Sequence, residues 1–340
     1  MPKDRSRLAK RPTRRIDAVV GPVDARQIPR YAGLGTFARL PQSAEVIKAD
    51  IAILGVPFDA GTTYRPGARF GPQAIRQASR LLRPYDPALD TEPWGTQQVV
   101  DAGDVGANPF SIPEALAAIE RDIARLLAAG TRVVTLGGDH TITLGALRAV
   151  HHHFGRVSLV HLDAHLDTWD TYFGASVTHG SFLRRAAEEG LFLDSASTHV
   201  GIRGPLYSRQ DLVQDAELGF RIVHCVELDE IGVGGAVKRI RTRTGNHPLY
   251  LSIDIDVLDP AHAPGTGTPE VGGLSTRELL ALVEGLSGLN VVGADVVEVA
   301  PSYDHAEITS LAAATVAYKL LSLLSASKPA KASGGRGNPG

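Results

Sequence analysis

Short apolar runs alternate with longer amphipathic segments through most of the chain, and this alternation predicts the fold. The runs expected to form strands are ADIAILGV (49–56), TQQVVDAG (96–103), TRVVTLGG (131–138), RVSLVHLD (156–163), STHVGI (197–202), FRIVHCV (220–226), PLYLSIDID (248–256) and LNVVGADVVEV (289–299). The segments expected to form helices include 71–82, 111–130, 141–154, 275–286 and 307–326. Strands that are apolar almost throughout, separated by helices, are typical of a parallel sheet covered by helices on both faces.

The chain is expected to form a single domain, residues 29–325, between two disordered tails. Residues 1–28 open with the basic sequence MPKDRSRLAKRPTRR, and residues 326–340 are polar and rich in glycine. The basic start lacks the apolar stretch of a secretory signal. Cys225 is the only cysteine, so no disulfide can form within the chain, which fits a reducing cytoplasm.

The amino-acid composition and net charge indicate which classes of binding partner to expect. Hydrophobic residues make up 43% of the chain and charged residues 21%, so a sizeable core is expected. The formal net charge is -2, whereas a nucleic-acid binder would usually be more basic. No apolar run approaches the roughly 18–20 residues of a membrane helix. Neither nucleic acid nor a membrane is therefore an expected partner.

Chemically active side chains follow four of the predicted strands at the point where each strand ends. The motifs are GGDH, ending in His140; DAHLD, with Asp163, His165 and Asp167; DIDVLDP, with Asp254 and Asp256; and VVEVAP, with Glu298. Open parallel sheets bind ligands outside the carboxyl ends of their strands. A cluster of buried carboxylates is costly without a cation, because the charges repel and resist desolvation.

The spacing within the motifs supports a site for two metal ions. In an extended segment residues i and i+2 point the same way, so we expect Asp163, His165 and Asp167 to face one site. Asp254 and Asp256 have the same relation. With the histidine of GGDH, two imidazoles and four carboxylates suit manganese, and less often nickel, cobalt or zinc. Two metals about 3.5–4 Å apart could share a water and lower its pKa.

Each motif taken alone has a simpler explanation. The two glycines of GGDH can form a turn, and Asp139 can cap a helix. DIDVLDP can be a strand that runs into a turn ended by proline. Only the combination of the motifs, all placed at strand ends in one chain, favours a dinuclear metal site over packing.

The motif set GGDH, DAHLD and SIDIDVLDP resembles the ureohydrolase family, which includes arginase, agmatinase and guanidinobutyrase. The stretches GVPFDAGTTYRPGARFGPQAIR, PGTGTPEVGGLSTREL and ADVVEVAPSYDHAEITSLAAA are similar to its agmatinase-like branch. The resemblance covers roughly residues 31–324. It implies a three-layer α/β/α sandwich around a mainly parallel sheet of about eight strands, and a homotrimer or homohexamer.

The resemblance also implies roles for the residues in the motifs. One manganese ion would be held by His140, Asp163, Asp167 and Asp254, and the other by Asp163, His165, Asp254 and Asp256. Asp163 and Asp254 would therefore bridge the metals. A hydroxide between the metals would attack a guanidinium carbon, and the intermediate would collapse to urea and an amine.

Three further residues acquire roles in the same way. Glu298 aligns with the carboxylate that pairs with the guanidinium, and a planar cation suits a carboxylate fork. His179, in VTHGSF, aligns with a histidine that shuttles a proton to the leaving amine. Asp139 is expected to orient His140 or its neighbours from outside the ligand shell.

The substrate is the part that the motifs leave open. Arginases carry an asparagine shortly after the DAHxD motif, and TWDTYFGASV has none. The loop 168–178 holds Trp169, Asp170 and Tyr172 but no lysine or arginine, which favours a cationic or neutral tail. Agmatine, cleaved to putrescine and urea, is therefore the favoured substrate. The alternatives are 4-guanidinobutanoate, another substituted guanidine, or an amide in a different dinuclear hydrolase. An inactive subunit of a hetero-oligomer is the alternative outside catalysis, although such a subunit would normally have lost a ligand.

Overall fold

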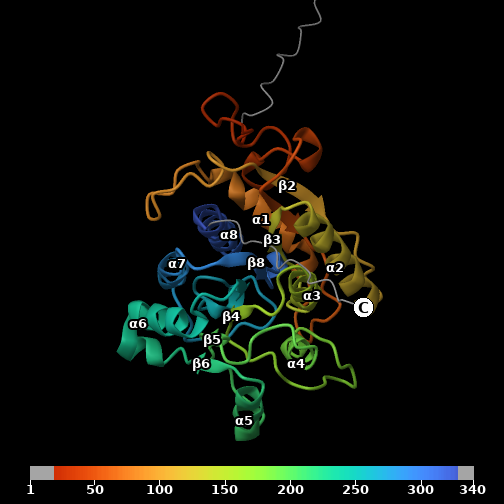
Figure 1. The fold of residues 1–340 in the computed structure, drawn as a ribbon, viewed down its shortest axis with the longest axis vertical. Coiled ribbons are helices and arrows are strands. Elements are labelled where there is room, and N and C mark those ends of the chain that lie inside the picture. The colour runs from red at the N-terminus through yellow and green to blue at the C-terminus, as the bar shows by residue number, and fades with distance from the viewer. Residues whose placement is uncertain (1–18, 328–340) are drawn as a thin grey trace, which may run out of the picture.

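Eight parallel strands form one central sheet in the computed structural model, which describes residues 19–327 (Figure 1). The strand order is β2-β1-β3-β8-β7-β4-β5-β6. The bounds are β1 Ile51–Gly55, β2 Val99–Asp104, β3 Arg132–Leu136, β4 Ser158–Leu162, β5 Thr198–Val200, β6 Arg221–Val223, β7 Leu249–Asp254 and β8 Val291–Val297. Each lies within a predicted run or extends one residue past it. The outer parts of the two predicted tails, residues 1–18 and 328–340, lie outside the described residues.

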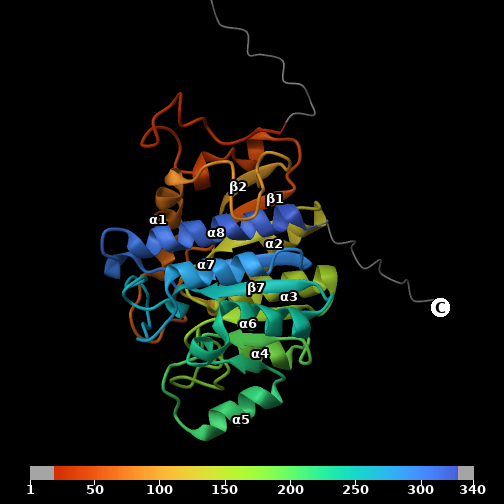
Figure 2. The same cartoon turned by 90° about the vertical axis from the view of Figure 1, so that its left-hand side faces the viewer.

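Helices cover both faces of the sheet, which confirms the predicted three-layer architecture (Figures 1 and 2). The helix bounds are α1 Gly71–Ala78, α2 Ile112–Ala128, α3 Ile142–Phe154, α4 Phe182–Glu188, α5 Arg209–Glu217, α6 Glu227–Thr244, α7 Thr276–Gly285 and α8 Ile308–Ala326. Helices α1, α8, α7 and α6 pack in succession on one face, and α2, α3 and α4 on the other. Each helical layer encloses its own hydrophobic cluster against the sheet.

Local sequence signals explain where helices α2 and α7 begin and where α2 ends. Helix α2 begins after Ser111, whose hydroxyl accepts a hydrogen bond from the backbone N–H of Glu114. It ends before Gly130, which has a positive φ of 80°. Helix α7 begins with a capping box between Ser275 and Glu278.

Helix α8 is a core helix of the domain. The expectation that no apolar run approaches a membrane helix was wrong for this segment, because its 19 residues are long and apolar enough to cross a membrane by length and composition. However, 78% of the apolar window is buried inside the protein. It packs against α1, α7, β8 and β3. The apolar surface that makes it resemble a membrane span is therefore covered by the rest of the fold.

Residues 19–28 lie against the domain, although the sequence places them in the N-terminal tail. The backbone N–H of Val20 donates to the side-chain oxygen of Gln98 at 2.8 Å. The guanidinium of Arg39, which is 4% exposed, donates to backbone carbonyls of this segment. Polar contacts of this kind leave no hydrophobic periodicity in the sequence. The alternation of apolar and polar residues therefore did not assign this segment to the domain.

One buried carboxylate joins three parts of the fold beside the outermost strand. Asp101, in β2, accepts two hydrogen bonds from the guanidinium of Arg76, in α1, at 2.8 and 3.0 Å. It also accepts from the backbone N–H of Phe37 at 2.7 Å. Asp101 is 2% exposed and Arg76 is 7% exposed, so neither charge has water as an alternative partner.

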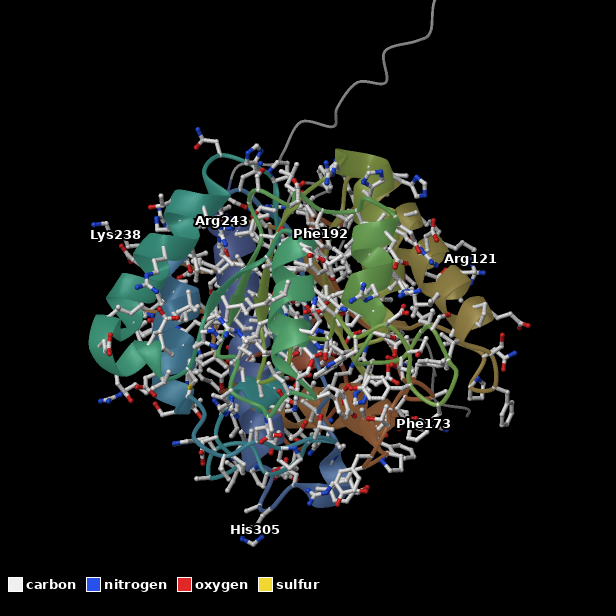
Figure 3. All side chains as sticks on the ribbon, turned by 90° about the horizontal axis from the view of Figure 1, so that it is seen from below. Arg121, Phe173, Phe192, Lys238, Arg243 and His305 are labelled. Carbon is white, nitrogen blue, oxygen red and sulfur yellow. The ribbon has the colours of Figure 1, made fainter. Side chains whose placement is uncertain are left out.

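Replacing Arg76 by methionine should strongly destabilise the fold. The change leaves Asp101 buried without its counter-charge, and breaking a buried pair in this way costs about 3–5 kcal/mol. Urea denaturation would measure the free energy of unfolding. The matched control is Arg121→Met on the outer side of α2, where Figure 3 shows Arg121 at the periphery and the side chain is 67% exposed. A loss below about 1 kcal/mol for Arg76→Met would contradict this role for the pair.

Candidate metal and substrate site

Four neighbouring strands at the centre of the sheet deliver the chemically active side chains to one edge. In the order β3-β8-β7-β4 they are adjacent and parallel. His140 follows β3, Glu298 follows β8, Asp254 ends β7 and Asp163 follows β4. The topology therefore brings together residues that lie far apart in the sequence.

The first group of possible ligands centres on the ring of His140. Its Nδ1 atom lies 3.1 Å from Asp163 Oδ2, 3.2 Å from Asp167 Oδ2 and 3.2 Å from Asp254 Oδ2. All four residues are buried. His140 Nδ1 and Asp163 Oδ2 have no hydrogen-bond partner. Buried polar atoms that face one another without partners are costly, and a shared cation would satisfy them.

The second group shares one carboxylate with the first. His165 Nδ1 lies 3.2 Å from Asp256 Oδ2 and 3.4 Å from Asp163 Oδ1. Asp163, His165 and Asp256 offer ligand atoms that all lie within 4.8 Å of one another. Asp163 thus presents one oxygen to each group, as a carboxylate that bridges two cations would. Asp254 faces only the first group in this arrangement, and its other oxygen accepts from the backbone N–H of Asp256 at 2.8 Å.

The charges of this cluster are unbalanced without a cation. Burial and the carboxylates of Asp256 and Asp163 raise the pKa of Asp254 well above its ordinary value. Burial and Asp163 raise the pKa of Asp167 to about 6. Burial would lower the pKa of His140, but the surrounding carboxylates raise it well above its ordinary value. The carboxylates therefore attract positive charge, and the residues present fit a divalent metal.

The backbone conformation that produces this convergence differs from the predicted one. The chain does not continue as an extended strand from Asp163 through His165 to Asp167, because β4 ends at Leu162 and Asp167 has a positive φ of 56°. Likewise Asp256 lies in a short 3-10 helix, residues 255–257, rather than in extended chain. The backbone turns, and the side chains meet because of these turns.

The orientation of His140 is fixed from the far side of its ring. Ser252 donates its only hydroxyl proton to Asp295 at 2.7 Å, so its oxygen accepts from Nε2–H of His140 at 2.8 Å. This leaves a lone pair on Nδ1, directed at the carboxylates. Asp139, predicted to orient His140 or its neighbours, accepts from the backbone N–H groups of Gly61 and of Thr141, the residue that follows His140.

A second buried chain of hydrogen bonds reaches the cluster through His161, a residue that sequence reasoning missed. His161 Nδ1 lies 2.8 Å from His199 Nδ1, and His199 Nε2 lies 3.1 Å from Asp215 Oδ1. Burial outweighs the attraction of Asp163 and lowers the pKa of His161 to about 3, so its ring is neutral. When Nε2–H of His199 donates to Asp215, Nδ1 of His199 accepts from Nδ1–H of His161. Nε2 of His161 then keeps a lone pair.

That lone pair makes His161 a further candidate ligand. His161 Nε2 has no hydrogen-bond partner and lies 3.0 Å from Asp163 Oδ2. It belongs to the same possible metal group as His140. The signal in the sequence was a histidine two residues before Asp163, inside an otherwise apolar strand.

Glu298 and His179 form a pair beside the metal ligands. Glu298 Oε1 lies 2.9 Å from His179 Nδ1 and accepts from the backbone N–H of His140 at 2.8 Å. The other oxygen, Oε2, is buried without a hydrogen-bond partner. His179 Nε2 lies 2.7 Å from the hydroxyl of Thr63, another residue that the sequence analysis missed. Burial would lower the pKa of His179, but Glu298 raises it to about 9.

The loop after DAHLD places two of its three predicted substrate residues in an aromatic cluster. The rings of Trp169, Tyr172 and Tyr207 contact one another, with centroids 5.9–6.5 Å apart. Burial raises the pKa of the Tyr172 hydroxyl, and Tyr207 and Asp167 add to this effect. The carboxylate of Asp170 is 68% exposed and pairs with Arg185, which also pairs with Glu188. The substrate role of Asp170 stays a prediction.

Comparisons with known proteins agree with this geometry. The arginase family matches residues 49–322. A putative agmatinase 1 from Schizosaccharomyces pombe is 42% identical over 91% of this chain and 86% of its own length.

The chain belongs to the arginase family. It is a metal-dependent amidinohydrolase, as the sequence predicted.

Other relatives in the family carry different substrates in their names. A guanidinobutyrase from Pseudomonas aeruginosa is also 42% identical, over 89% of this chain and 96% of its own length. Among solved structures, the proclavaminate amidino hydrolase from Streptomyces clavuligerus has a TM-score of 0.85 at 42% identity and covers 88% of this chain and 100% of its own. Overall identity within the arginase family therefore does not separate the substrates.

The buried histidine chain of this arginase-family protein should tune its metal affinity. Asp215→Ala removes the outer partner of His199 and should raise the apparent dissociation constant for manganese about 10- to 100-fold, the usual effect of losing such support. Electron paramagnetic resonance of free manganese would measure it. The control is Asp194→Ala, an exposed carboxylate (65%). An affinity within twofold of the parent protein would contradict the role of this chain.

Proposed function

We propose that this protein hydrolyses a guanidino compound to urea and an amine with two manganese ions. The proposed ligands are His140, Asp163, His165, Asp167, Asp254 and Asp256, with Asp163 and Asp254 shared. When bound, such a metal pair lowers the pKa of a shared water and supplies hydroxide near neutral pH. Nickel, cobalt or zinc are the alternative ions for the same donor set.

One observation carries the choice of a guanidinium substrate. Glu298 is completely buried next to the metal ligands, and its Oε2 atom has no partner. An unpaired buried carboxylate oxygen attracts a cation, and a guanidinium offers planar N–H groups that suit it. Glu298 would hold the guanidinium and fix its plane relative to the metals.

His179 is the proposed proton donor. Its raised pKa keeps the imidazole protonated at neutral pH in the absence of metals, and cations at the neighbouring carboxylates would lower that pKa by repulsion. Thr63 and Glu298 hold the two ring nitrogens. The leaving amine requires a proton, and an imidazolium held in this position can deliver it.

Agmatine is the proposed substrate because the loop that follows the DAHLD motif carries an aromatic cluster. Trp169, Tyr172 and Tyr207 can contact an ammonium through their ring faces. A second candidate, 4-guanidinobutanoate, is favoured by a different observation: Asp170 already pairs with Arg185, so it is less available to an ammonium. Phe173, in the same loop, is 93% exposed and lies at the periphery in Figure 3.

A urea-release assay on manganese-loaded protein tests the proposal. With agmatine, 4-guanidinobutanoate and arginine as substrates, we expect kcat/KM to be highest for agmatine and lowest for arginine. Glu298→Gln should keep the metal content and lower kcat/KM roughly 10- to 100-fold, the worth of a charged hydrogen bond. Absence of urea from every guanidine, in protein that holds its metals, would refute the reaction. A preference for 4-guanidinobutanoate would refute only the choice of agmatine.

A further inference from the structure

A cavity lined by five arginines lies far from the metal ligands, beside the N-terminal segment. Its volume is about 520 Å³, within the range of small-molecule sites. The arginines are Arg26, Arg30, Arg39, Arg80 and Arg83. They come from the segment 19–40 and from the stretch that follows α1, which lie together at the β2 end of the molecule (Figure 1).

The charge of this cavity is not balanced within the described part of the chain. Arg26 pairs with Asp24 at 3.0 Å, and Asp24 also lines the cavity. None of the ion pairs formed by residues 19–327 involves the other four arginines. Four positive charges around one cavity repel one another, and a bound anion would relieve this repulsion.

The walls also hold buried donors that lack acceptors. Trp94 is 2% exposed, lines the cavity, and its indole N–H has no hydrogen-bond partner. The Nε–H groups of Arg30 and Arg80 are likewise buried without a partner. Each such donor costs about 1–3 kcal/mol if nothing accepts from it. All three are donors, so the missing partner is an acceptor.

Two of the arginines, Arg39 and Arg80, are held in place by hydrogen bonds to backbone carbonyls. Arg80 donates to the carbonyl of Arg30 at 2.8 Å, and Arg39 donates to the carbonyl of Val23 at 2.8 Å. Ala38 and Arg39 have consecutive positive φ angles of 48° and 59°. Non-glycine residues in this conformation are strained and are often found at ligand sites.

The ends of the chain are unsuitable occupants. Residues 1–18 contain seven lysines and arginines and two aspartates, and residues 328–340 contain three basic and no acidic side chains. Basic segments are repelled by a basic cavity. The missing acceptor is therefore expected from outside the chain.

We propose that this cavity binds a small oxyanion, either inorganic phosphate or a compound with carboxylate groups. Its oxygens accept from the indole N–H of Trp94 and from the arginines, which bind such groups through several N–H donors at once. The bound anion fastens the N-terminal segment to the stretch after α1. Trp94 in turn contacts Tyr318 of α8, with ring centroids 5.1 Å apart.

The fluorescence of Trp94 can report this binding directly. The chain has two tryptophans, so in full-length Trp169→Phe protein Trp94 is the sole emitter. Titration with phosphate and with succinate, at constant ionic strength set by sodium chloride, should change the emission saturably for at least one of them. At ten times the midpoint concentration, Tm should rise by about 2 °C.

Two arginine variants and one control decide the assignment. Arg83→Gln and Arg30→Gln, in the same background, should raise the midpoint at least tenfold, while Arg121→Gln leaves it unchanged. Arg83 is exposed, so its replacement should not impair folding, and in the parent protein it should leave urea release unchanged. An equal response to chloride, or an equal midpoint in Arg83→Gln and Arg121→Gln, would overturn the proposal. The proposal would also be overturned if neither phosphate nor succinate changed the emission while light scattering showed that the arginine variants differ in molar mass from the unaltered protein. The acceptor would then come from a second copy of the chain.

Discussion

The mutual repulsion of four buried carboxylates is the constraint on which the rest of the site depends. Asp163, Asp167, Asp254 and Asp256 meet where four central strands end, and water is excluded from them. Two imidazoles are the only opposite partners that the ligand set supplies, and one of them, His140, is pulled toward protonation by its neighbours. A site of this kind is stable with cations in it, so folding and metal binding support one another.

The backbone around the site allows these side chains to lie close together. Gly138, in GGDH, passes so close to the next segment that an added Cβ atom would lie 1.6 Å from the carbonyl oxygen of Phe58. The backbone N–H of Glu298 donates to the carbonyl of Gly138 at 2.8 Å, and Glu298 itself has a positive φ of 63°. This close approach sets the carboxylate of Glu298 beside the candidate metal ligands, at a cost in backbone strain typical of functional sites.

Most of the architecture could be predicted because hydrophobic periodicity and helix caps are local signals. The sequence also indicated which residues converge, since parallel strands end at one edge. The turns that aim them could not be predicted: Asp167 adopts a left-handed conformation and Asp256 lies in a 3-10 helix, and both depend on contacts with other strands. For the same reason Arg185, fifteen residues after Asp170, could not be assigned as its partner. His161 could have been predicted as a candidate site residue, because a histidine in a buried strand requires a polar partner.

Titration of metal-free protein with manganese, followed by electron paramagnetic resonance, tests whether Asp163 bridges two ions. Because Asp163 presents one oxygen to each group of candidate ligands, we expect two ions per chain with the spectrum of an exchange-coupled pair. In Asp163→Asn both the stoichiometry and the coupling should fall. Binding of a single ion, or of two uncoupled ions, by the unaltered protein would show that no bridged pair forms.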